Sequence, residues 1–229
     1  MDFLLEGFVQ AFHLLLSGHG ETYSAVWTTL RVSTGSILAC LILGLPAGFI
    51  LGFVEFPGRK FLRTVSDTLL ALPTVVVGLV VYAFITQRGP LGGLGLLFTQ
   101  PAIVVGQTLL ALPIVVSLTA SALEGLDARL GLTLRTLGAD RRQVALTSLR
   151  EAGFALMAAA ATAYGRIISE VGVAMMLGGN IKYHTRTITT AMALETNKGE
   201  FAIGLALGLV LLLIAFSVNG FLAMLKRRA

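Results

Sequence analysis

The amino-acid sequence predicts an all-α membrane protein that crosses the bilayer several times. Of its 229 residues, 55% are hydrophobic and only 13% are charged, against about 25% charged residues in soluble domains. The charges are clustered, and the apolar runs between them reach the length of about 20 residues that a helix needs to cross the hydrocarbon core. We expect helices throughout, because an open chain in lipid can satisfy its backbone hydrogen bonds only within helices.

The N-terminal residues, 1–20, are amphipathic. Asp2, Glu6, Gln10 and His13 recur at helical spacing, with Phe, Leu and Val between them. The apolar part is too short to span comfortably, so we expect an interfacial helix that lies at the membrane surface. A short spanning segment is the alternative. The acidic start is unlike the basic region of a secretory signal peptide, so we expect no cleavable signal.

Five later stretches are candidates for transmembrane helices. Four of them contain no charged residue, namely residues 32–54, 68–87, 101–123 and 201–225. The fifth, residues 152–177, is apolar except for Arg166 and Glu170. It is either one spanning helix with a functional polar pair or a helix that breaks midway, near Gly165 or Gly172.

The distribution of Lys and Arg predicts an external N-terminus and a cytoplasmic C-terminus. Eleven of the 17 basic residues fall on residues 54–67, residues 124–151 and the C-terminal tail, and four fall on the opposite set of connections. Basic residues are enriched in cytoplasmic loops. The 124–151 connection is therefore expected in the cytoplasm and residues 178–200 outside. No internal repeat stands out, so residues 1–229 are interpreted as a single transmembrane domain.

The sequence lacks the motifs of an enzyme. It contains no Gly-Lys dipeptide and hence no phosphate-binding loop, and its three histidines have no metal-ligand spacing. Cys40 is the only cysteine, which excludes an intrachain disulfide. Basic and aromatic residues are not interleaved as in nucleic-acid-binding proteins. We expect a channel, a transporter or a membrane subunit of a complex, with no cofactor, metal or nucleic acid of its own.

The 124–151 connection is long and rich in charge, and its pattern predicts helix, turn, helix. Leu130, Leu134 and Val144 recur near helical spacing on either side of Gly138. The turn is expected at residues 138–140, with Asp140 capping the second helix. Composition alone favours two interpretations equally: an ordinary hairpin between two spans, and an element on which a soluble partner docks.

This connection resembles the EAA loop of ABC transporter permeases. The resemblance rests on the run Arg135-Thr136-Leu137-Gly138-Ala139 and the basic stretch that follows. The family's Glu-Ala-Ala start is replaced by Leu-Thr-Leu, and its Ile-x-Leu-Pro end by Ser-Leu-Arg-Glu. The resemblance implies that the loop couples the chain to a separate ATPase. The coupling residues would be Arg135, Thr136, Leu137, Gly138, Ala139, Asp140 and Arg141.

A longer resemblance runs from about Thr22 to the C-terminus. Residues 165–172 (GRIISEVG) and 174–180 (AMMLGGN) are similar to the molybdate/tungstate/sulfate permease group. Within that group, residues 181–187 (IKYHTRT) and 189–196 (TTAMALET) look most like tungstate permeases. The resemblance implies the type I ABC importer fold, with about five transmembrane helices in the inner or plasma membrane.

The resemblance also implies the function and the partners. The chain would be the permease of an ATP-driven importer of tungstate, or of molybdate, sulfate or another small solute. Two copies would form the pathway, two cytoplasmic ATPase subunits would bind ATP and Mg, and an external binding protein would deliver the oxyanion. From another class of function, a stand-alone anion channel or secondary carrier is the alternative.

Polar residues in and beside the fifth stretch are candidates for the pathway. Arg166 and Glu170 are four residues apart and share a helix face, either as a structural ion pair or with Arg166 lining the pathway for an anion. The external stretch 178–200 adds hydrogen-bond donors at Asn180, Thr185 and Thr187. We expect this stretch to dock a partner and to gate the pathway; a merely solvated loop is the alternative.

Overall fold

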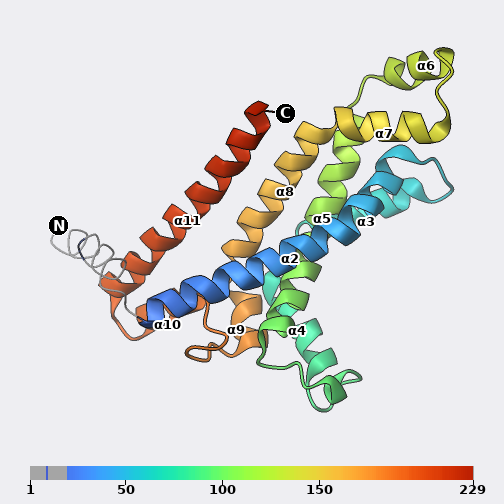
Figure 1. Ribbon diagram of the computed structural model, residues 1–229. Helices are drawn as coiled ribbons and strands as arrows, with labels where there is room; N and C mark the ends of the chain where they lie inside the picture. The colour runs from blue at the N-terminus through green and yellow to red at the C-terminus, as the bar shows by residue number, and fades with distance from the viewer. Residues whose placement is uncertain (1–8, 10–19, 229) are drawn as a thin grey trace.

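The computed structural model describes residue 9 and residues 20–228, and this part of the chain is helical without β-strands (Figure 1). The predicted all-α fold is confirmed. The interfacial helix predicted for residues 1–20 lies outside the described residues, except for residues 9 and 20. The described helices are α2 (Gly20–Phe53), α3 (Arg59–Leu69), α4 (Thr74–Ile85), η1 (Gly92–Leu94), α5 (Gln100–Glu124), α6 (Ala128–Thr136), α7 (Arg141–Glu151), α8 (Gly153–Ile168), α9 (Gly172–Gly178), α10 (Ile188–Asn197) and α11 (Phe201–Arg228).

Helix α2 begins earlier than the sequence predicted. It starts at Gly20, whereas the charge-free stretch starts at residue 32. Arg31 does not end the helix, because its side chain is exposed on the surface of α2. The 34 residues rise about 51 Å, more than the hydrocarbon thickness of about 30 Å. The first part of α2 therefore extends beyond the hydrocarbon core or runs at a tilt.

Glycines bring α2 close to α5, the helix against which it packs most extensively. Gly44, Gly48 and Gly52 follow one another at four-residue spacing on the side that faces α5. A Cβ atom on Gly48 would lie only 2.5 Å from the Cβ of Thr119. Small residues at this spacing allow two membrane helices to approach closely. The structure therefore assigns these glycines to packing.

The prediction of one continuous span over residues 68–87 is wrong. Helix α3 ends at Leu69, a turn follows, and α4 begins at Thr74 with its axis bent by 102° from that of α3. Pro73 causes the break, because its ring removes a backbone donor and disfavours helix in the residue before it. The charged α3 and the apolar α4 thus form one bent pair.

The fifth stretch is also interrupted, which confirms the second of its two predicted alternatives, a helix that breaks midway. Helix α8 ends at Ile168 and α9 starts at Gly172. The non-helical residues between them, 169–171, lie directly before one of the two glycines that the sequence indicated. The same segment is bent at its other end, where α7 and α8 meet at 58°.

Three of the described helices, α2, α5 and α11, are each long and apolar enough to cross a membrane. The bent pairs α3–α4 and α7–α8 raise this number to five if each pair is one span, which agrees with the predicted number. A buried cluster that includes Ile37, Cys40, Val115 and Ile167 holds α2, α5 and α8 together. Cys40 is fully buried and serves as a small apolar side chain.

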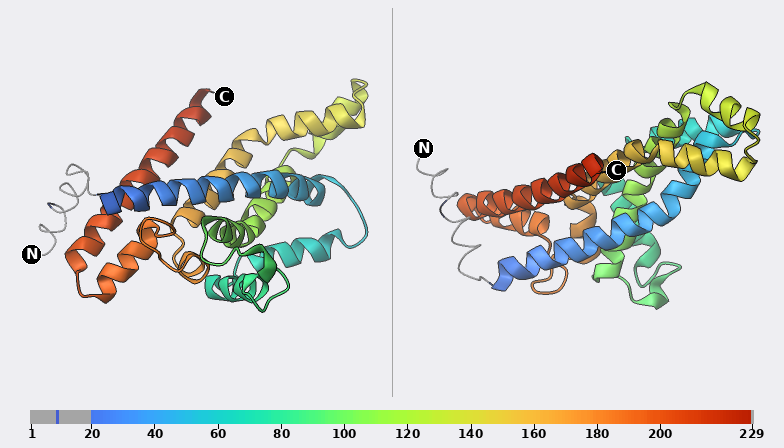
Figure 2. Two further views of the ribbon diagram at one scale, coloured as in Figure 1. Left: turned by 60° about the horizontal axis from the view of Figure 1, so that its bottom comes forward. Right: turned by 45° about the horizontal axis from the view of Figure 1, so that its top comes forward.

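The connections fall at two ends of the molecule. The loop with α6 and α7, the C-terminal end of α2 and the C-terminal end of α11 lie at one end, and α10 and the connection after α4 lie at the other (Figures 1 and 2). The three segments richest in Lys and Arg thus lie at the same end, as the distribution of basic residues predicted. We call the first end the α6–α7 end below.

Candidate functional site

The α6–α7 loop is built from two capped helices around a tight turn. Asp127 caps α6 and accepts from the backbone N–H of Arg129 at 2.8 Å. Asp140 accepts from the N–H of Gln143 at 2.7 Å, and the Gln143 side chain accepts in return from the N–H of Asp140 at 2.8 Å. This reciprocal capping box fixes the start of α7. The predicted helix, turn and helix are confirmed, and so is the capping role of Asp140.

Gly138 makes the turn possible. Its φ of +86° lies in the left-handed region, which glycine adopts without a Cβ clash. The Ala139 N–H then donates to the Leu134 carbonyl at 2.9 Å, which closes the end of α6. The loop therefore consists of two capped helices joined by a defined turn.

The tip of this unit is exposed and partly apolar. Leu132 and Leu137 are 65% and 78% exposed, although both are large apolar side chains. Six of the seven predicted coupling residues are exposed in the isolated chain, and Ala139 is half-buried. Exposed apolar side chains next to cations are typical of a surface on which another protein docks.

Glu170 braces the break between α8 and α9. One carboxylate oxygen lies 2.7 Å from Arg166 Nη1, and the other accepts from the N–H of Val173 at 3.1 Å. Its backbone carbonyl accepts from Thr189 Oγ1 at 2.9 Å, which adds α10 to the junction. Glu170 is almost fully buried, whereas the Arg166 side chain is 35% exposed. The Glu170 carboxylate is therefore part of the buried structure, whereas the Arg166 guanidinium group is partly accessible from outside the chain.

Two residues at this junction were not singled out from the sequence. Gln107 donates to the Ile167 carbonyl at 3.4 Å, which serves a carbonyl at the open end of α8. The Ser36 hydroxyl in turn donates to Gln107 Oε1 at 3.0 Å. A buried Gln in a charge-free span was the available signal, because a polar side chain at that depth needs partners.

The threonines in the stretch predicted to be external take part in the fold. Thr185 is fully buried, accepts from the N–H of Ile181 at 3.0 Å and donates to the Gly178 carbonyl. Thr187 caps α10 in a capping box with Thr190. In this conformation their hydroxyls are used within the chain. This segment is therefore held together by its own hydrogen bonds.

An ion-pair cluster ties residues 180–186 to the start of α2. Glu21 pairs with Lys182 at 2.6 Å and with Arg186. Arg186 Nε also donates to Asn180 Oδ1 at 3.1 Å and its Nη2 to the Asn180 carbonyl at 3.3 Å. The hydrogen bond to Glu21 raises the pKa of the Lys182 ammonium above its usual value of 10.5. Asn180 is thus held by Arg186 and not free in solution.

A second ion-pair cluster lies at the α6–α7 end. Arg59 pairs with Glu124 at 3.0 Å and donates to the Leu51 and Gly52 carbonyls at 2.6 and 3.0 Å, near the end of α2. Arg63 lies 2.6 Å from Asp67 and 3.4 Å from Glu124. These contacts anchor α3 to α2 and α5.

The chain resembles a known protein family over most of its length. Residues 44–229 match the family described as binding-protein-dependent transport system inner membrane component. The match covers most of the chain and includes the α6–α7 loop and the α8–α9 break. The chain belongs to this family.

Relatives of this permease align along nearly its entire length. A tungstate uptake system permease protein of Campylobacter jejuni is 51% identical over 99% of this chain and 95% of its own. A second one, from Peptoclostridium acidaminophilum, is 36% identical over 96% of each chain. The molybdenum transport system permease protein of Escherichia coli K12 is 31% identical over 84% of this chain and 91% of its own.

The permease shares its fold with chains of solved ABC transporters. A chain of an inward-facing methionine ABC transporter superposes with a TM-score of 0.76 and 19% identity, over 93% of this chain and 98% of that one. A chain of a bacterial alginate ABC transporter also gives 0.76, with 20% identity, over 94% of this chain and 82% of that one. The expected type I importer permease fold is therefore confirmed, in a multi-pass inner-membrane protein.

Proposed function

We propose that this chain is the permease of an ATP-driven importer and that its substrate is tungstate. The observation that carries the proposal is the 51% identity, over 99% of the chain, to a tungstate uptake system permease protein. A second relative with that description covers 96% of the chain. Relatives described as molybdenum and sulfate permeases are 31% and 28% identical, which makes molybdate the second candidate.

Two copies of the chain would form the pathway, and two ATPase subunits would dock on the α6–α7 loops. The exposed tip with Leu132, Leu137 and the neighbouring cations supports this contact. ATP and Mg would bind to the ATPases. An external binding protein would deliver the anion to the end that carries residues 178–200, where α10 would act in docking and gating.

The polar face of α8 would line the pathway. Thr162, Arg166 and Ser169 lie on one side of α8 and are wholly or partly exposed, whereas Ala163 and Ile167 are buried in the core. A polar stripe at membrane depth faces a wet cavity or another subunit and not lipid. Arg166 would offset the charge of the passing anion, without the tight chelation that would prevent release.

The bent segment α7–α8 would transmit the movement. Only Ala152 separates α7 from α8, so a displacement of the docked loop would act directly on the helix that carries Arg166. ATP would drive the change because it binds one state of the ATPase pair more tightly than the other. The same displacement would reach the α8–α9 junction at Glu170.

The experiment is substrate-stimulated ATP hydrolysis by the reconstituted complex of permease, ATPase and binding protein. Tungstate is expected to stimulate hydrolysis at lower concentration than molybdate, and sulfate least. A preference for molybdate would replace the substrate assignment and leave the importer intact.

A stand-alone anion channel or secondary carrier predicts a different result. Vesicles that contain only this polypeptide would then show anion flux, whereas the importer requires the ATPase and ATP. Flux without the ATPase, unaffected by its addition, would overturn the proposed function.

A further inference from the structure

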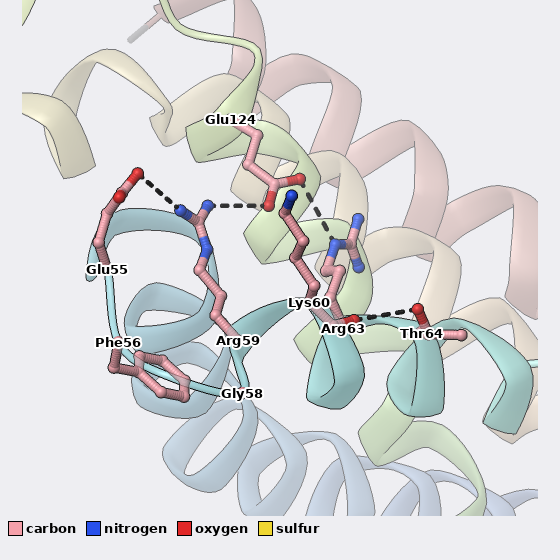
Figure 3. A pocket seen from close by; sticks show the side chains of 8 residues that line it. All are labelled: Glu55, Phe56, Gly58, Arg59, Lys60, Arg63, Thr64 and Glu124. Carbon is pink, nitrogen blue, oxygen red and sulfur yellow. Dashed lines mark hydrogen bonds and ion pairs between the residues drawn. The ribbon is translucent and has the colours of Figure 1, made fainter.

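Two cavities meet at α3, near the α6–α7 end. The first, of about 770 Å³, lies between the end of α2, the start of α3 and the end of α5, and Figure 3 shows its lining side chains. The second, of about 390 Å³, is a groove between α2, α3 and α5. Phe56 lines both, so the two cavities adjoin.

The first cavity is lined by charged side chains, and one of its cations takes part in none of the ion pairs described above. Arg59 and Arg63 already hold Glu124, and Arg59 also caps α2. Lys60 is exposed, and its ammonium group has no ion-pair or hydrogen-bond partner among the residues that the structure describes. An anion that enters this cavity would therefore meet the free charge of Lys60, with two guanidinium groups nearby.

The second cavity is apolar and runs along α2 away from its C-terminal end. Its lining includes Ala47, Ile50, Leu62, Val65, Leu69 and Leu112. Ala47 lies six residues before the end of α2 at Phe53, which is a depth of about 9 Å along the helix. Leu62, Val65 and Leu69 are exposed on α3 even though they are large and apolar.

One buried hydroxyl in this groove lacks a partner. Ser66 is 6% exposed, lines the groove, and its Oγ makes no hydrogen bond within the described part of the chain. A buried polar group without a partner costs free energy. An acceptor inside the groove, such as an ester oxygen, would satisfy it.

The orientation of α3 fits the membrane surface. Its axis is bent by 102° from that of α4, so α3 lies close to the membrane plane when α4 crosses it. Its charged residues then lie at headgroup level and its apolar residues toward the acyl chains, as in interfacial amphipathic helices.

We propose that these adjoining cavities bind one anionic phospholipid from the leaflet at the α6–α7 end. The phosphate would contact Lys60, a glycerol ester would accept from Ser66, and an acyl chain would occupy the groove under α3. Basic pockets between transmembrane helices bind anionic headgroups in this way. Because α3 is tied to α2 and α5, the lipid would stabilise the end of the molecule that carries the α6–α7 loop.

Native mass spectrometry of the purified full-length chain, titrated with phosphatidylglycerol or phosphatidylcholine, tests the proposal. The charge variant is Lys60→Gln, and the groove variant is Ala47→Phe. The matched control is Arg88→Gln, which removes an exposed cation from the connection after α4, at the opposite end. Lys60→Gln is expected to weaken phosphatidylglycerol binding about fivefold and leave phosphatidylcholine unchanged. Ala47→Phe should weaken both lipids, and Arg88→Gln neither.

Three results would overturn the site. The first is unchanged binding of phosphatidylglycerol in both variants, which would place the lipid elsewhere. The second is displacement of the lipid by inorganic phosphate at millimolar concentration, which would make the cavity a site for free anions. The third is a change of oligomeric state in Ala47→Phe with lipid binding unaffected, which would assign the groove to a second copy of the chain.

Discussion

Arg166 and Glu170 meet at the point where the fifth membrane segment stops being helical, with Arg166 Nη1 2.7 Å from Glu170 Oε2. The buried carboxylate also accepts from the Val173 N–H at 3.1 Å, so it satisfies a donor at the start of α9. The same side chain thus balances a charge and replaces a helical hydrogen bond. Helix breaks at membrane depth need such partners, because lipid offers none.

Replacing Glu170 by Ala should destabilise the permease strongly. The change removes the acceptor of the Val173 N–H and leaves Arg166 unpaired. We expect the free energy of unfolding to fall by about 2–3 kcal/mol, as for hydrogen bonds to charged groups. Thermal unfolding in detergent measures it, with Lys198→Ala as control, since that change breaks an exposed pair with Glu195 worth at most about 1 kcal/mol. Equal shifts in both variants would contradict a bracing role for Glu170.

Arg166→Gln separates a pathway role from a structural one. A neutral amide still donates to Glu170, so assembly should persist while the positive charge is lost. We expect transport to fall roughly tenfold, from the loss of one charge at a separation of several Å in a partly wet site. Arg166→Lys should restore most of the rate. Full transport by an intact Arg166→Gln complex would exclude Arg166 from the pathway.

Arg186 should matter more than Lys182, although both pair with Glu21. The Arg186 side chain is 14% exposed and holds Asn180 as well, whereas that of Lys182 is 51% exposed. We expect Arg186→Gln to cost about 1.5–3 kcal/mol, and Lys182→Gln to cost clearly less because its charge is screened by solvent. Hydrogen exchange of residues 180–190 reports the loosening of the segment. Equal hydrogen exchange in the two variants would contradict this prediction, because the buried Arg186 would then contribute no more than the exposed Lys182.

The contribution of Lys182 to stability depends on pH in one direction, and it is lost only at high pH. Glu21 raises the pKa of Lys182, so the lysine binds its proton more tightly when folded. Its contribution to stability is complete below the usual lysine pKa of 10.5 and is lost as the pH rises through the higher folded-state pKa. Hydrogen exchange of residues 180–190 should therefore show no step in the neutral pH range that depends on Lys182.

Because α2 and α5 approach closely, the stability of the protein should fall sharply as the side chain at position 48 becomes larger. A Cβ there would lie 2.7 Å from the Val116 carbonyl oxygen as well as against Thr119. We expect Gly48→Ala to cost about 1–3 kcal/mol and Gly48→Leu to abolish stable expression. Gly35→Ala on the same helix is the control, because its Cβ would meet only Val104 methyl groups, the nearer at 3.3 Å. Wild-type stability of Gly48→Leu would refute this interface.

The local features of the fold were readable from the sequence, and the long-range ones were not. Gly138 and Asp140 act through neighbours within a few residues, so their turn and cap follow from residue type alone. The cluster of Glu21 and Arg186 joins residues 165 positions apart. No periodicity or spacing along the chain encodes such a pair.

The bend between α3 and α4 shows why hydropathy misplaced the second span. Residues 68–87 are uncharged throughout, and an average over them does not register Pro73 as a break. The charged α3 was interpreted as a loop, but Arg63 bonds Ser117 at 2.9 Å and Ser121 at 2.6 Å on α5. Those partners hold α3 against α5, and the helical spacing of its charged and apolar residues was the sequence signal that the interpretation as a loop missed.

Gly138→Val should uncouple the permease from its ATPase. The left-handed φ of +86° is unfavourable for a β-branched residue, at a cost of about 1–2 kcal/mol, so the turn between α6 and α7 would open or shift. We expect an intact membrane domain whose complex hydrolyses ATP without substrate stimulation, or releases the ATPase. Co-purification and stimulated hydrolysis distinguish these two outcomes.

Gly131→Ala is the matched control for that experiment. Gly131 lies inside α6 and has helical backbone geometry, and a methyl group added there would meet open space, as one added at Gly138 would. Alanine there should favour the helix by about 0.5–1 kcal/mol and leave coupling unchanged. Because both substitutions add bulk to the same exposed unit, a loss of coupling confined to Gly138→Val would follow from the shape of the turn. Wild-type coupling in Gly138→Val would show that the ATPase does not depend on this turn.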